Sequence, residues 1–224
     1  MTLVNSIFTW FMKKRMHQIE LFIKYPYDVQ DEWFQSLISS AQHTEWGKEH
    51  GYSSIYTQDQ YKERVPIQNY DTLKPYIERM LAGEQNVLWP SEIKWFAKSS
   101  GTTNDRSKFI PVSEESLEEC HFKGGKDLLT MYCDNRPDTK IFTGKCLVLG
   151  GSHQINQLNA DSCYGDLSAV LIKNLPFWAE FYRTPEMSIA LMDNFEEKVE
   201  KMAQATIGVN VTNISGVPTW NLVL

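Results

Sequence analysis

The sequence lacks the features that define several large classes of protein. Its four cysteines include no Cys-x-x-Cys pair, and no histidine lies at ligand spacing from two of them. This pattern gives no support for a zinc site. It favours free thiols in a reducing compartment. The cysteines are Cys120, Cys133, Cys146 and Cys163.

Basic residues are scarce relative to acidic ones. The chain has 22 Lys and Arg against 28 Asp and Glu, which gives a formal net charge of -6. A protein that binds nucleic acid through its phosphates needs a cationic surface. We therefore expect no nucleic acid partner.

Long hydrophobic runs are also missing. Residues 3–12 are largely apolar, but this run is too short to span a bilayer. The cations Lys13, Lys14 and Arg15 follow the run, whereas those of a secretory signal precede it. We therefore expect no membrane partner and a cytoplasmic location.

What is present is typical of a globular α/β protein. Hydrophobic residues make up 42% of the 224 residues and charged residues 22%, enough for one large domain or two small ones. Helical spacing dominates the N-terminal part, and short apolar runs alternate with helices after it, which favours a mixed sheet with crossover helices. Two helices are expected over residues 7–25 and 193–207. A helix over 71–81 is expected to be capped by Asp71 and ended by Gly83. Shorter helices are expected after the caps Asp28 and Thr57, and another is expected to begin at Ser113 and to be strained at Gly124-Gly125. Expected strands are 93–97, 109–112, 145–149, 188–191 and 210–215.

The most distinctive segment is the loop Ser99-Ser100-Gly101-Thr102-Thr103-Asn104-Asp105-Arg106-Ser107-Lys108, between two predicted strands. Its hydroxyls and backbone N–H groups can donate to one polyanion, and Lys108 can neutralise part of that charge. A nucleotide triphosphate is the obvious ligand. The simpler alternative is that Ser and Thr are common in loops because they satisfy local backbone groups. A Walker loop is a poor fit, since it needs a second glycine before its lysine and a helix after it.

Two other polar segments have plainer interpretations. The strand 145–149 ends in Gly150-Gly151-Ser152-His153, where His153 is interpreted as a polar loop residue. The predicted helix 193–207 carries mixed charges that we interpret as a solvated face. Those charges are Glu196, Glu197, Lys198, Glu200 and Lys201.

The last residues have the composition of an interrupted helix. Residues 218–224 begin with a proline in the first turn, continue with apolar residues, and show no cap. The pattern indicates a chain that continues in the complete protein.

Three motifs together resemble one family. Residues 99–103 followed by Lys108, the continuation 108–111, and the segment Ile214-Ser215-Gly216-Val217-Pro218-Thr219-Trp220 are similar to motifs of the Gretchen Hagen family, the auxin-responsive acyl-acid amido synthetases, in its bacterial form. This family belongs to the adenylate-forming, luciferase-like superfamily. The residue spacing before Lys108 is longer than in most of that superfamily, and it favours this branch.

The resemblance implies a fold and a reaction. The chain would be the N-terminal part of the large domain of an adenylate-forming enzyme. Residues 1–224 would form an incomplete adenylation domain without the adenine motif, the ribose motif or the C-terminal domain. The enzyme would use ATP and Mg²⁺ to convert a carboxylic acid to an acyl-adenylate. It would then transfer the acyl group to an amino acid or another amine.

The resemblance also implies site residues. Lys108 would be catalytic, and it would bind the nucleotide together with Ser99, Ser100, Gly101, Thr102 and Thr103. Val217, Pro218 and Trp220 would line the acyl pocket, although Trp220 is equally well explained as a core aromatic. No protein metal ligand is implied.

One departure and two alternatives remain. Plant members carry Ala-Gly at Asn104-Asp105, and Asp105 adds negative charge near the expected phosphates, which Arg106 or Mg²⁺ would have to offset. The alternatives are an acyl-coenzyme A ligase and a degenerate module used only for interaction. The acid, the amine and the oligomeric state stay open, and we expect the fragment alone to be inactive.

Overall fold

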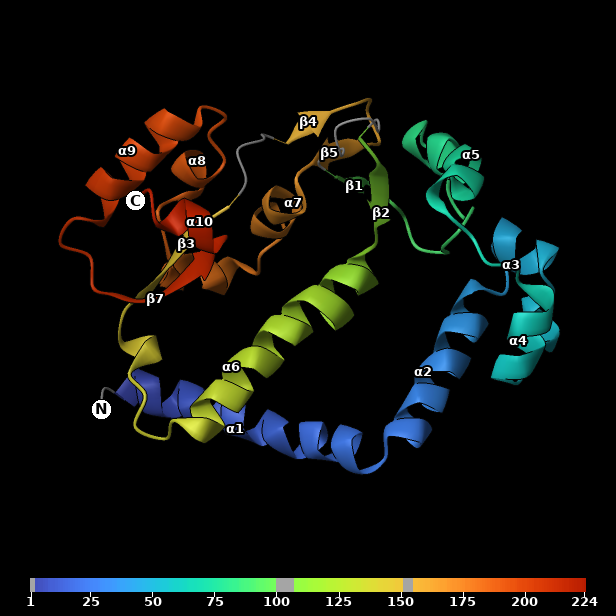
Figure 1. Ribbon diagram of the computed structural model, residues 1–224, viewed down its shortest axis with the longest axis horizontal. Helices are drawn as coiled ribbons and strands as arrows, with labels where there is room; N and C mark the ends of the chain where they lie inside the picture. The colour runs from blue at the N-terminus through green and yellow to red at the C-terminus, as the bar shows by residue number, and fades with distance from the viewer. Residues whose placement is uncertain (1–2, 100–106, 151–154) are drawn as a thin grey trace. The chain divides into compact units, whose positions relative to one another are not determined.

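The computed structural model describes residues 3–99, 107–150 and 155–224 (Figure 1). The chain divides into two units, which are described separately. Unit 1 comprises residues 1–19, 117–156 and 165–224, and unit 2 comprises residues 20–116 and 157–164. Helices and short strands alternate after a helical N-terminal region, so the predicted α/β class with a mixed sheet is confirmed.

The elements are as follows. The α-helices are α1 (Leu3–Lys24), α2 (Pro26–Ala41), α3 (Glu45–Glu49), α4 (Gln58–Arg64), α5 (Tyr70–Leu81), α6 (Lys123–Asn135), α7 (Leu167–Lys173), α8 (Met187–Ala190), α9 (Phe195–Thr206) and α10 (Pro218–Asn221). The strands are β1 (Trp95–Lys98), β2 (Phe109–Val112), β3 (Lys145–Leu149), β4 (Asn156–Gln157), β5 (Cys163–Gly165), β6 (Arg183–Thr184) and β7 (Val211–Gly216). The remaining helical turns are η1 (Tyr52–Ser54), the π-helical η2 (Ser116–Phe122), η3 (Ile141–Thr143) and η4 (Phe177–Tyr182).

Of three helix caps predicted in unit 2, the structure confirms one and places the other two at different residues. The Thr57 side chain accepts a hydrogen bond from the N–H of Gln60, as expected of the cap of α4. Helix α2 begins at Pro26 instead, and Asp28 lies inside its first turn. Proline is favoured at the first helical position because its missing N–H would have no partner there.

Helix α5 begins one residue before the predicted cap. Asn69 and Thr72 form a capping box, in which each side chain accepts a hydrogen bond from the backbone N–H of the other. Asp71 therefore lies in the first turn, where its charge favours the helix dipole. Gly83 follows the helix with a φ of 101°, a conformation that glycine adopts readily, so the predicted end is confirmed.

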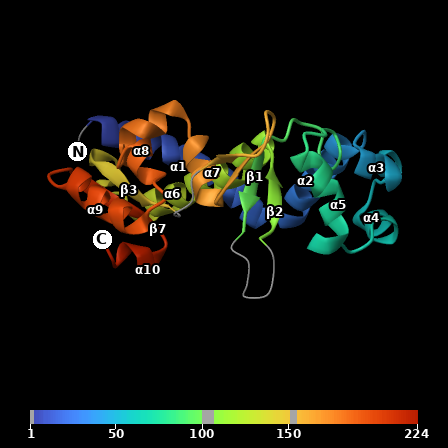
Figure 2. The ribbon, with the colours of Figure 1, turned by 90° about the horizontal axis from the view of Figure 1, so that it is seen from above.

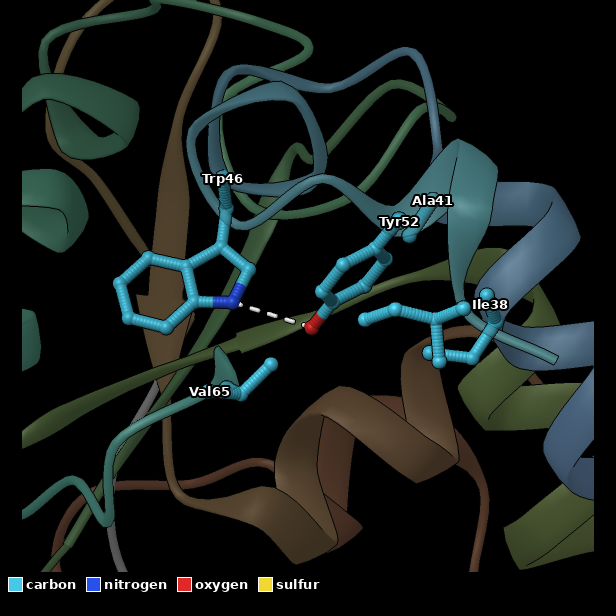
Figure 3. Close-up of a cluster of buried hydrophobic side chains, with 6 residues drawn as sticks. Ile38, Ala41, Trp46, Tyr52 and Val65 are labelled. Atoms are coloured by element: carbon cyan, nitrogen blue, oxygen red, sulfur yellow. Dashed lines mark hydrogen bonds between the residues drawn. The ribbon is translucent and has the colours of Figure 1, made fainter. Parts of the chain in front are cut away.

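The helices of unit 2 enclose a small aromatic core, shown in Figure 3. Ile38, Ala41, Trp46, Tyr52 and Val65 are buried together with Ile55. The indole N–H of Trp46 donates to the Tyr52 hydroxyl at 3.0 Å. The polar ends of both aromatic side chains are thereby satisfied inside the core.

The sheet of unit 2 has the strand order β2-β1-β5-β4. Strands β1 and β2 form an antiparallel hairpin in which Lys98 is opposite Phe109, and they lie side by side in Figure 2. Strand β1 begins two residues later than predicted. Phe96 of β1 is fully buried with Ile93, next to Ile77 and Met80 of α5.

Unit 1 contains a parallel sheet of strand order β6-β3-β7. The predicted strands 145–149 and 210–215 are confirmed as β3 and β7. The predicted strand 188–191 is wrong, because Met187–Ala190 forms helix α8. A four-residue apolar run does not distinguish a strand from a buried helical turn, and Ala190 is fully buried in that turn.

The segment after β2 also departs from the expected pattern. Ser113 begins the helical segment as predicted, since its hydroxyl accepts from the N–H of Ser116. The irregularity lies in the π-helical turn η2, and α6 passes through Gly124 and Gly125 without a break. A Cβ at either glycine would meet no atom within 4 Å, so both positions are exposed helical sites.

The described residues contain no helix that is both long and apolar enough to cross a membrane. All four cysteines are free thiols, as expected.

Candidate functional site

The hairpin β1–β2 positions both ends of the Ser/Thr-rich loop. The N–H of Ser99 donates to the carbonyl of Lys108 at 2.8 Å, and the N–H of Lys108 donates to the Ser99 hydroxyl at 3.2 Å. Ser99 and Lys108 therefore form the last rung of the hairpin. The other predicted nucleotide-binding residues, Ser100, Gly101, Thr102 and Thr103, lie outside the described residues, as do Asn104, Asp105 and Arg106.

Helix α5 supports the base of this loop through its first residue. The Tyr70 hydroxyl accepts a hydrogen bond from the N–H of Phe109 at 2.9 Å. The Lys108 ammonium lies 5.5 Å from the centre of the Tyr70 ring, within the range of a cation–π interaction. Tyr70 thus fixes both the backbone and the cation at the C-terminal end of the loop.

A second cation lies at the N-terminal end of the loop. The Lys98 ammonium is 5.7 Å from the centre of the Tyr164 ring, which also makes an edge contact with Phe109 at 5.3 Å. Lys98 and Lys108 project to opposite faces of the hairpin, because Lys98 is paired with Phe109 and side chains alternate along a strand. The two ends of the loop therefore each carry a lysine, one on each face of the hairpin.

The sequence interpretation missed Lys98 and Tyr70. Lys98 was detectable, since it lies between the predicted strand 93–97 and the loop. Tyr70 was not, because its contact with Phe109 joins residues 39 positions apart and arises only from packing of α5 on β2.

The second predicted site segment follows β7 in unit 1. Leu149 of β3 is paired with Gly216 of β7, and the strands are parallel, so both end at one edge of the sheet. Ligands in parallel sheets bind at this edge. Val217 is 43% exposed and Pro218 is exposed, whereas Trp220 is half-buried.

Trp220 lies on the core of unit 1. Its ring is 6.0 Å from that of Phe195, and it packs against the cluster of Leu147, Leu149 and Met202. This packing supports the alternative interpretation of Trp220 as a core aromatic. Val217 and Pro218 retain the exposure that a ligand contact needs.

Glycine is required at the end of β7. A Cβ at Gly216 would lie 2.6 Å from the carbonyl oxygen of Leu149, too close for any other residue without a shift of the strands. The side-chain oxygen of Asn221 lies beside this glycine, buried and without a hydrogen-bond donor among the described residues. An acceptor of this kind can bind a donor group of a ligand.

One residue of helix α9 lies in an environment that differs from the sequence prediction. Lys198 was interpreted as part of a solvated face, but it is fully buried, and its ammonium donates to the Gly150 carbonyl at 3.3 Å. The neighbouring Lys201 does lie at the surface, in an ion pair with Glu197. The interpretation of His153 falls outside the described residues.

Comparison with known proteins identifies relatives of the chain. A family model described as the GH3 family N-terminal domain matches residues 15–223. The jasmonoyl-L-amino acid synthetase JAR4 of Nicotiana attenuata is 29% identical over 104 residues, 46% of this chain and 18% of that protein. The indole-3-acetic acid-amido synthetase GH3.3 of Arabidopsis thaliana is 31% identical over 91 residues, 40% of this chain and 15% of that protein.

The fold is that of a solved relative. The GH3.15 acyl acid amido synthetase superposes with a TM-score of 0.74 at 16% identity, covering 90% of this chain and 36% of that one. The chain therefore spans little more than a third of this structure, and its matches span less than a fifth of the curated relatives. The family match extends over nearly the whole sequence and confirms the resemblance that the motifs indicated, so the chain belongs to the GH3 family and corresponds to its N-terminal domain.

Proposed function

We propose that the protein containing this chain is an ATP-dependent acyl-acid amido synthetase. The observation that carries the proposal is the loop between Ser99 and Lys108, closed by an antiparallel hairpin and flanked by a cation on each face. Curated relatives with matching segments are named jasmonoyl- and indole-3-acetic acid-amido synthetases. We propose no particular acid or amine for this protein.

The donor set fits the phosphates of ATP. A triphosphate needs N–H and O–H donors together with positive charge, and Lys98, Lys108 and the hydroxyl-rich loop supply both kinds of group. In this proposal Lys108 neutralises charge while an anionic carboxylate approaches the α-phosphate. Mg²⁺ is bound mainly by phosphate oxygens and water in such sites, so it needs few protein ligands.

The acid would bind at the edge of the sheet of unit 1. Val217 and Pro218 are exposed there, and Trp220, which packs on the core, would support the surface that they form. Residues 1–224 would form the N-terminal part of the adenylation domain, with the adenine, ribose and C-terminal elements supplied by other parts of the protein.

A cytoplasmic enzyme that uses ATP is consistent with free thiols.

The test is pyrophosphate exchange by the full-length protein with a panel of carboxylic acids. Lys108→Ala should lower kcat/KM about 10- to 100-fold, the range expected for one charge-assisted contact to phosphate. Lys62→Ala is the matched control, because Lys62 is an exposed lysine of unit 2 in a surface ion pair with Asp59. Full activity of Lys108→Ala would remove that residue from the mechanism.

The product distinguishes this proposal from its alternatives. Amide formation with an amino acid supports the amido synthetase, and a thioester with coenzyme A would instead indicate an acyl-coenzyme A ligase. If the full-length protein neither binds ATP nor exchanges pyrophosphate with any acid, a non-catalytic interaction module is the better description. The 224-residue chain alone should show no turnover.

A further inference from the structure

A buried lysine in unit 1 has no role in the function proposed above. Lys198 has no solvent-exposed surface, although it belongs to a helix whose other charged residues lie mainly at the surface. It is four residues from Met202, which is also fully buried, so the two share the face of α9 that packs on the sheet. A lysine therefore occupies a position where an apolar residue would pack well.

Three segments of unit 1 contribute groups that interact with its ammonium. The carbonyl of Gly150, directly after β3, accepts a hydrogen bond at 3.3 Å. Burial lowers the pKa of Lys198 below its usual value. The carboxylates of Asp166 and Asp193 favour the charged form and offset part of that decrease. Asp193 lies just before α9 itself, whereas Asp166 precedes α7, so together with Gly150 the ammonium interacts with two segments that are distant in sequence.

The hydrogen bond from Lys198 lies at the C-terminal end of β3, beside the segment proposed to bind the acid. Gly150 follows Leu149, which is paired with Gly216 at the end of β7. Residues 217–220 begin immediately after that glycine. Space around Gly150 is limited as well, since a Cβ there would lie 3.1 Å from the side chain of Ile172. The hydrogen bond from Lys198 thus restrains the backbone at the end of β3.

Stability alone is a poor explanation for a lysine here. Removing an ammonium from water is costly, and an apolar residue of similar volume is often equally or more stabilising at such a position. A long side chain can pack at this face of α9 without a charge, as the uncharged Met202 does one turn further along the helix. What an apolar residue cannot supply is the hydrogen bond that fixes the Gly150 carbonyl.

We propose that Lys198 is a positioning residue, whose buried ammonium fixes the C-terminal edge of the β3–β7 pair and so orients residues 217–220 toward the acyl acid. The last part rests on the proposed function of this segment. The hydrogen bond itself is independent of that function, and the experiment separates the two.

The experiment compares three variants of the full-length protein. Lys198→Met keeps the length and apolar packing of the side chain but removes the donor, and Lys198→Arg keeps the charge. Lys201→Met is the matched control, because it removes an exposed lysine from the same helix. Two quantities are measured: amide hydrogen exchange in β3 and β7, and the KM values for acid and for ATP in pyrophosphate exchange.

Lys198→Met should accelerate hydrogen exchange at 148–150 and 214–216 about tenfold, the change expected from loss of one hydrogen bond to a charged group. Exchange in the β1–β2 hairpin of unit 2 should stay unchanged. The KM for the acid should rise about tenfold, while the KM for ATP stays within about twofold. Lys198→Arg should recover part of both effects, which a loss of packing alone would not explain.

Strand-edge exchange equal to that of Lys201→Met would overturn the proposal, as would an unchanged KM for the acid in an active enzyme. If the wild-type protein activates no acid, the proposed function fails, and the exchange data alone decide whether Lys198 fixes the strand edge. Should Lys198→Met fail to fold, Asp193→Asn replaces it, because it weakens support for the ammonium without altering the core. It should then accelerate exchange at the same amides, and unchanged exchange would overturn the proposal.

Discussion

The aromatic core of unit 2 provides a sharp test of the structure. Tyr52→Phe removes one oxygen atom and leaves the ring, so the apolar packing in Figure 3 and the edge contact with Tyr61 at 6.0 Å should persist. The lost hydroxyl is the acceptor for the indole N–H of Trp46 at 3.0 Å. Both Trp46 and Tyr52 are only 8% exposed, so water cannot readily replace the acceptor.

The expected cost follows from the group left without a partner. A buried donor that loses its acceptor costs about 1–3 kcal/mol, which is a large part of the roughly 5–15 kcal/mol by which a typical domain is stable. At about 1.4 kcal/mol for each factor of ten, the opening of unit 2 should become roughly 5- to 150-fold more frequent.

Native-state hydrogen exchange of the amides in α2 and α4 is the suitable assay. It measures the stability of this unit directly, whereas a chain with two units need not unfold in a single transition. Tyr56→Phe is the control, since Tyr56 is 66% exposed and should change little. A difference of less than about 0.5 kcal/mol between the two variants would refute the reasoning.

Two further predictions concern the titration of a tyrosine and a partly buried ion pair. Burial raises the pKa of Tyr52 to about 12, so the stability that its neutral form contributes should be complete below about pH 10 and lost as the pH rises to 12. Denaturation by urea at pH 9 and pH 11 checks this, and an equal pH dependence in Tyr52→Phe would contradict it. Arg15→Met should destabilise unit 1 by about 1–3 kcal/mol, because the partly buried Asp127 carboxylate loses both its contacts to the guanidinium, at 2.7 and 3.0 Å. Hydrogen exchange in α6 measures that loss, and the double variant with Asp127→Leu should recover most of it.

Local signals in the sequence predicted most of the elements near the loop. The Thr57 cap, the glycine at 83 and the strands around residues 99–108 depend on interactions within a few residues. The cap predictions at Asp28 and Asp71 were wrong by three and two residues, because Pro26 and Asn69 are stronger start signals at those positions. Secondary structure is least certain where several residues can serve as the cap.

Short apolar runs carried less information. The segment 187–190 became a helix because its neighbours in space bury it as a turn, and nothing in four residues specifies this. Trp220 likewise has two interpretations in the sequence. The structure places it on the core beside Phe195, while its exposed neighbours Val217 and Pro218 keep the acyl-pocket role as a proposal.

The sequence by itself determined the family, the hydroxyl-rich loop and the lysine that ends it, because a motif is a property of residues close together in the chain. The tertiary structure alone decided which groups surround that loop. Tyr70 reaches Phe109 only because α5 packs on the hairpin. Lys198 is buried only because its face of α9 meets the sheet, and no count of charges along a helix tells which face will do so.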